Sequence, residues 1–157
     1  MEIVYRSFKT NLASKKIDWN TAGLKVALVR SDYAPNVLHS MWSEVAPYEI
    51  AGSAGSYEQI TSSSGKVLAN PLIVEVSDGT VYCTVENPVW DSATISSAAM
   101  AVVVWWDSTA GGSGAYRLVS CHSWRSVING ATTQGSGILF CDYGDTSTPS
   151  RGALFAL

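Results

Sequence analysis

Charged side chains are scarce in this sequence. Asp, Glu, Lys and Arg make up 15% of its 157 residues, whereas soluble domains usually carry about 25%. The net charge is −3, and the longest run of basic residues is Lys15-Lys16. Because nucleic-acid binding needs a basic stripe that neutralises phosphates, we expect no nucleic-acid partner. The low charge also indicates that part of the surface faces another protein; an ordinary monomer with a surface rich in Ser and Thr is the alternative.

Long apolar runs are absent as well. The longest, Ala98–Trp106, has nine residues, about half of what a membrane-spanning helix needs. The chain opens with Met1-Glu2 and lacks the basic and apolar regions of a signal peptide. We therefore expect no membrane association and folding in a cytoplasm. The length suits one hydrophobic core, so residues 1–157 are expected to form a single domain.

Cysteine is rare and its spacing carries no motif. Cys83, Cys121 and Cys141 lie far apart and form no C-x-x-C pair, so we expect no zinc site, redox motif or cofactor. Each lies in a strand-like run, where a free cysteine behaves as a small apolar residue. Buried thiols are the expectation, and a disulfide or a bond between chains is the alternative.

Signals for catalysis and metal binding are equally weak. The only histidines are His39 and His122, and an acid such as Asp142 could orient His122 near a serine. However, the sequence contains no G-x-S-x-G motif. The glycine-rich loops lack the lysine of a P-loop, and residues 142–145 lack the spaced acids of an EF-hand. We expect no catalytic residue, no metal site and hence no enzyme.

Short helices are expected only near the N-terminus. Residues Tyr5–Ser14 place Phe8 and Leu12 at helical spacing. Residues Val37–Val45 repeat apolar side chains at the same spacing before Pro47. These patterns predict one or two short helices.

The rest of the chain has the pattern of a mainly β protein. Asp78-Gly79 is a two-residue hairpin signal between two of the expected strands. With about eight short strands and no alternation with helices, the sequence predicts an antiparallel β-sandwich or barrel. The expected strands are Leu24–Val29, Val67–Ala69, Leu72–Val76, Val81–Glu86, Thr94–Trp106, Ala115–His122, Gly137–Tyr143 and Gly152–Leu157.

Tryptophan is the residue type that suggests an interface. The strand that ends at Trp105-Trp106 is apolar on both faces, which fits either a central strand under the N-terminal helix or a subunit interface. Trp105 and Trp106 point to opposite faces, so the core of the isolated domain needs at most one of them. Aromatic residues concentrate in interface cores. The interface candidates are Trp19, Trp42, Trp90, Trp105, Trp106 and Trp124. Filling of the core, or stacking on sugars as in carbohydrate-binding modules, are the alternatives.

Several segments occur in an order and spacing that is familiar. They are Lys16–Thr21, Leu24–Val29, Ser31–Pro35, Met41–Val45, Asn87–Ile95, Gly137–Phe140 and Gly152–Leu157. Together they resemble a family of small virion structural proteins of tailed phages, in which no active site is known. The chain departs from the family at Ala22-Gly23 and at His122-Ser123-Trp124.

The resemblance implies a non-enzymatic component of a tailed-phage virion. Capsid decoration or cementing is the favoured role, through contacts with a major capsid protein or other virion proteins and through self-association. A neck or tail component is the alternative, and a carbohydrate-binding adhesion module is a more distant one.

Overall fold

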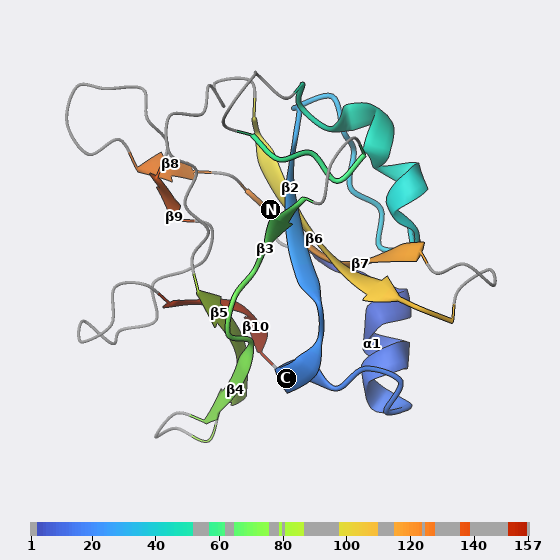
Figure 1. Ribbon diagram of the computed structural model, residues 1–157, viewed down its shortest axis with the longest axis vertical. Coiled ribbons are helices and arrows are strands. Elements are labelled where there is room, and N and C mark those ends of the chain that lie inside the picture. Colours follow the sequence, from blue (N-terminus) through green and yellow to red (C-terminus); the bar gives the residue numbers. More distant parts are fainter. Residues whose placement is uncertain are drawn as a thin grey trace.

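The computed structural model describes residues 3–51, 57–61, 65–75, 79, 81–86, 98–109, 115–123, 125–127, 136–138 and 151–156. In this part the fold is mainly β and antiparallel, with α1 as its α-helix and three 3₁₀-helices labelled η (Figure 1). The elements are β1 (Ile3–Val4), α1 (Arg6–Ala13), η1 (Trp19–Thr21), β2 (Leu24–Val29), η2 (Trp42–Glu44), η3 (Ala46–Tyr48), β3 (Lys66–Val67), β4 (Leu72–Glu75), β5 (Val81–Glu86), β6 (Met100–Asp107), β7 (Ala115–Ser123), β8 (Arg125–Val127), β9 (Ser136–Ile138) and β10 (Arg151–Ala156).

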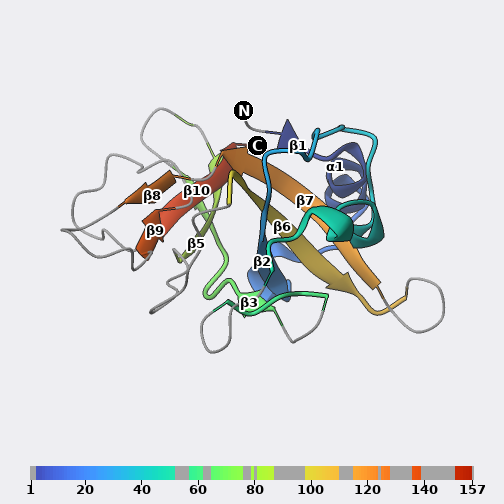
Figure 2. The ribbon, with the colours of Figure 1, turned by 90° about the horizontal axis from the view of Figure 1, so that it is seen from above.

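The strands form three sheets in the described residues. The largest has the order β1-β7-β6-β2-β3, a second has the order β10-β5-β4, and β8 pairs with β9. The five-stranded sheet has two edges, β1 and β3, so it is not a closed barrel. The second sheet lies beside it in both views (Figures 1 and 2). The expectation of a mainly β, antiparallel fold is confirmed, and the open sheets favour a sandwich-like arrangement over a barrel.

Strand β6 lies at the centre of the largest sheet. It is the third of the five strands, and it pairs with β2 from Leu24↔Trp105 to Val29↔Met100. Both strands consist mostly of apolar residues, as is typical of strands that are covered on both faces. The register with β7 shifts between Val103 and Val104, which marks a bulge.

Two hydrophobic cores cover the two faces of this sheet. The first core contains Ala101, Val103 and Trp105 of β6, and the second contains Val102 and Val104. The first core also includes Phe8, Ile17, Trp19, Leu24, Val26, Leu28, Ile50, Tyr57, Leu68, Cys83, Val85 and Val119. The second core also includes Tyr5, Ala27, Val29, Tyr33, Trp42, Val45, Ile60, Leu118 and Cys121. Side chains of the same chain thus cover β6 on both faces, and its apolar pattern needs no partner subunit.

The helix expected over residues 37–45 is wrong. The chain forms a turn at Val37-Leu38 and the single 3₁₀ turn η2 within this range, η3 follows, and Leu38 is 65% exposed. The Met41 N–H, which in a helix from residue 37 would donate to the Val37 carbonyl, donates to the Glu44 carboxylate, which also accepts from the Ser40 N–H. Asn36 accepts from the Leu38 N–H. Such local bonds compete with helix formation. The other expected helix is confirmed as α1.

The expected antiparallel pairing of Leu72–Val76 with Val81–Glu86 is confirmed as β4 and β5, with Glu75 opposite Val81. Asp78 lies outside the described residues. Gly79 has a φ of +82°, which glycine adopts without strain. Each of the eight expected strands overlaps a strand of the structure. The sequence pattern missed β1 and β8, which have two and three residues. None of the described helices is long and apolar enough to span a membrane.

Candidate functional site

The structure separates the tryptophan candidates by exposure. Trp19 is 1% exposed and lies in the first core, and Trp42 is buried in the second core. The neighbours Trp105 and Trp106 are 9% and 44% exposed, so they do face opposite ways. Trp90 and Trp124 lie outside the described residues. Trp106 is therefore the described candidate whose side chain is available to a partner.

Trp106 belongs to a small exposed surface on the sheet face that carries the second core. Its ring packs edge-on against Tyr116 of β7, with 4.8 Å between ring centroids. The ammonium group of Lys25 lies 4.9 Å from the centre of the Tyr116 ring and donates a hydrogen bond to its hydroxyl. Lys25 pairs across the strands with Val67, which is 60% exposed. We call Lys25, Val67, Trp106 and Tyr116 the Trp106 surface.

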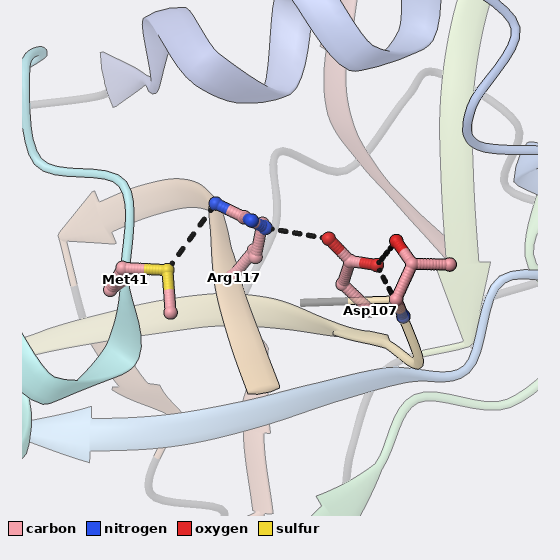
Figure 3. Close-up of polar contacts among 4 residues, drawn as sticks. Met41, Asp107 and Arg117 are labelled. Carbon is pink, nitrogen blue, oxygen red and sulfur yellow. Dashed lines mark hydrogen bonds and ion pairs between the residues drawn. The ribbon is translucent and has the colours of Figure 1, made fainter. Parts of the chain in front are cut away.

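A polar network lies on the opposite face, at the end of the β6–β7 pair (Figure 3). The Nε atom of Arg117 donates to Asp107 at 2.7 Å, and Nη1 donates to the sulfur of Met41 at 3.3 Å. Asp107 also accepts from the hydroxyl and the N–H of Thr109, at 2.7 and 3.0 Å. The bonds from Thr109 and Arg117 outweigh the effect of burial and hold the pKa of Asp107 below its usual range. Asp107 is therefore ionised at neutral pH and fixes the Arg117 guanidinium.

This network borders a pocket of about 840 Å³ between α1 and the ends of β6 and β7. Residues of α1 and the following turn, such as Arg6, Asn11 and Lys16, form one side. Trp105 and Arg117 line the other side, and they are directly opposite each other in the β6–β7 register. The pocket is polar and mixed in charge. No sequence motif indicates this pocket, because its residues are far apart in the chain and meet only in the folded protein.

The histidine considered as a catalytic base lies next to a serine. The Nε2 atom of His122 is 2.9 Å from the Ser120 hydroxyl, but both residues are buried within β7. No substrate carbonyl could reach this pair without opening the sheet. Asp142 lies outside the described residues. The pair therefore has the geometry of a buried structural contact within β7.

His39 ends a chain of hydroxyl contacts that the sequence did not reveal. The hydroxyls of Tyr5 and Tyr33 lie 2.8 Å apart, and Tyr33 is 3.0 Å from Nδ1 of His39. Burial raises the pKa of Tyr33 to about 12 and that of Tyr5 further still. Both hydroxyls therefore stay protonated and connect the start of α1 to the turn before η2.

The thiols are placed as the sequence indicated. Cys83 and Cys121 are buried and free, and burial raises the pKa of each to about 12. Cys141 lies outside the described residues. In the described part, no three His, Cys, Asp or Glu side chains form a group that could hold a metal ion.

Comparison with known proteins gave no match. No family model matches the sequence, no curated protein is similar to it, and no solved structure is similar to the fold. The candidate sites of this chain are therefore the Trp106 surface and the pocket beside Arg117, argued from their own geometry.

Proposed function

We propose that this chain is a non-enzymatic structural component of a tailed-phage virion that joins the particle through protein–protein contacts. Decoration or cementing of the capsid is the favoured role. The resemblance of its segments to small virion proteins supports the virion assignment. The observation that carries the proposal of a docking protein is the Trp106 surface.

Trp106 is exposed although the fold around it is complete. Both faces of β6 already have their own core, so the 44% exposed indole is not needed to fill either one. Tryptophan is among the residues that contribute most to binding when an interface buries them. The Tyr116 ring supports the indole from one side, which lowers the loss of side-chain freedom on binding. A rigid aromatic on the same sheet face as an exposed valine fits the centre of a protein contact.

The test is binding of the purified chain to heads and to tails of the phage that encodes it. We expect binding to heads, and we expect Trp106→Ser to weaken it by roughly 30-fold, or about 2 kcal/mol, as for a tryptophan hot spot. Ile73→Ser is the matched control, because Ile73 is 47% exposed and lies in another sheet.

Two results would redirect the proposal. Binding to tails alone would assign the chain to the neck or tail. Specific binding to a glycan array that Trp106→Ser abolishes would assign the surface to sugar stacking. A third result would contradict it: if Trp106→Ser, Ile73→Ser and the unchanged chain all bound heads equally well, Trp106 would not belong to the interface.

A further inference from the structure

We propose that the pocket between α1 and the β6–β7 pair binds an acidic peptide segment of a partner protein. This deepens the proposed function, because it rests on the chain docking to other proteins. It adds a second contact on the face opposite the Trp106 surface. The charge, the hydrogen-bond donors and the volume of the pocket support it.

The pocket concentrates positive charge in an acidic protein. The whole chain has 10 basic residues and a net charge of −3, yet three cations line this pocket: Arg6, Lys16 and Arg117. Asp107 is the carboxylate among the lining residues. Within the described residues, Arg6 and Lys16 form no ion pair, whereas Arg117 pairs with Asp107. Two uncompensated cations thus lie beside one neutralised guanidinium, which favours an anionic partner.

Arg117 is held in place while most of its donors remain available. A guanidinium has five N–H donors. One of them donates to Asp107, and a second donates to Met41, whose thioether sulfur is a weak acceptor. The Arg117 side chain is 28% exposed at the pocket wall. A guanidinium already fixed by one carboxylate loses little freedom when it binds a second one, and its planar fork suits carboxylate oxygens.

Two residues of the pocket wall have a buried polar atom without a hydrogen-bond partner in the described part of the chain. The two atoms are the Ser7 hydroxyl oxygen and the indole nitrogen of Trp105. Trp105 is nine-tenths buried, so an unpaired donor there is unfavourable. Both atoms are buried behind the pocket surface, so a bound peptide that displaced the side chains covering them would supply the missing acceptor.

The same wall favours a peptide over a nucleic acid or a free phosphate. Leu38, which is 65% exposed, and the Trp105 ring offer apolar contacts for peptide side chains. Thr10 and Asn11 are neutral hydrogen-bonding groups suited to a peptide backbone. A volume of about 840 Å³ lies near the upper end for small-ligand sites and admits a few residues.

The experiment is a titration of the full ¹⁵N-labelled chain followed by the NMR signals of its indole N–H groups. The probe is an N-acetylated, C-amidated Glu-Glu-Leu-Glu-Glu peptide, and the reference probes are its Lys counterpart, inorganic phosphate and a short thymidine oligonucleotide. We expect the acidic peptide to shift the Trp105 signal, which is identified by its loss in Trp105→Phe. The Trp106 signal should stay in place.

Variants then test which cations are responsible. Exchange of both Arg6 and Lys16 for Gln should weaken binding of the acidic peptide about tenfold or more, and 0.5 M salt should weaken it similarly. Lys9→Gln is the matched control, because Lys9 is an exposed residue of α1 outside the pocket lining. It should change the affinity less than about twofold.

Three outcomes would overturn the inference. In the first, the acidic peptide shifts the Trp105 signal no more than the Lys peptide does. In the second, Lys9→Gln weakens binding of the acidic peptide as much as the exchange of Arg6 and Lys16 does. In the third, phosphate or the oligonucleotide binds more tightly than the acidic peptide. These outcomes differ from failure of the proposed function, which concerns Trp106→Ser and particle binding on the opposite face.

Discussion

Trp105 and Trp106 are neighbours in sequence, but a strand turns their side chains to opposite faces. Trp105 lies in the first core, whereas Trp106 is exposed. We expect Trp105→Ser to lower the free energy of unfolding by about 3–5 kcal/mol, as for other large core residues, and Trp106→Ser to lower it by less than about 1 kcal/mol. Urea denaturation of both variants measures this. Similar losses for the two would mean that Trp106 supports the fold.

The buried thiols give a second prediction at the scale of single residues. With a pKa of about 12, Cys83 and Cys121 carry almost no thiolate at neutral pH, and the thiolate is the reactive form. In a Cys141→Ser background, we expect slow labelling of the native chain at pH 8 and fast labelling of both thiols in denaturant. Native labelling should speed up as the pH rises toward 12. Fast native labelling at pH 8 would show that one of the two strands opens readily.

At the scale of elements, the end of the β6–β7 pair depends on Asp107. Its lowered pKa means that the ionised form stabilises the fold at any pH above the ordinary value of 3.8. This contribution is lost as the pH falls through the lower pKa of the folded state. We expect Asp107→Asn to lower the free energy of unfolding by about 1–2 kcal/mol at pH 7. Near pH 2, the free energies of unfolding of the variant and the unchanged chain should differ by less, because Asp107 is then largely protonated.

Urea denaturation at the two pH values measures this difference. Asp32→Asn is the control, because the Arg30–Asp32 pair is exposed and should contribute little. A loss for Asp107→Asn that is independent of pH would show that packing, not charge, explains the effect.

The sequence predicted those elements whose signal is local. Alternating and apolar runs marked β2, β5, β6 and β7, and Asp78-Gly79 marked the turn between β4 and β5. The helix over residues 37–45 failed because the Glu44 carboxylate accepts from the Met41 N–H, which a helix would have used, and this bond overrides the apolar spacing. Of the sites, the opposite orientation of Trp105 and Trp106 followed from strand geometry. The pocket did not, because about 110 positions separate Arg6 from Arg117, and the β1–β7 pairing and the packing of α1 on β7 bring them near.

At the scale of the whole molecule, the first core joins the two larger sheets. It contains Cys83 and Val85 of β5 together with Leu24 of β2, and Trp19 lies between them. The Trp19 indole donates to the Leu72 carbonyl of β4 at 3.2 Å and packs edge-on against Phe8. Neither sheet can lose this core without exposing the other. The two sheets should therefore unfold together.

Thiol exposure tests this cooperativity, since Cys83 lies in one sheet and Cys121 in the other. In the Cys141→Ser chain, the reactivity of both thiols is measured at increasing denaturant concentration. Both thiols should become reactive at the denaturant concentration at which half of the β structure is lost. Trp19→Leu should lower that concentration for both thiols together. Exposure of Cys83 at a distinctly lower denaturant concentration would show that the β10-β5-β4 sheet is a separate folding unit.

The pairing of β1 with β7 also determines when the chain can fold during its synthesis. Ile3 pairs with Cys121, so β1 has no sheet partner until β7 exists, and β2 can pair with the short β3 but not with β6, because Leu24 pairs with Trp105. At a ribosomal rate of about 5–20 residues per second, the roughly 120 residues from β1 to β7 leave β1 without its partner for about 6–24 seconds. During this interval the apolar side chains of β1, α1 and β2 are incompletely covered and open to chaperones. A product that ends before β7 would consequently aggregate or be degraded instead of accumulating as a folded fragment.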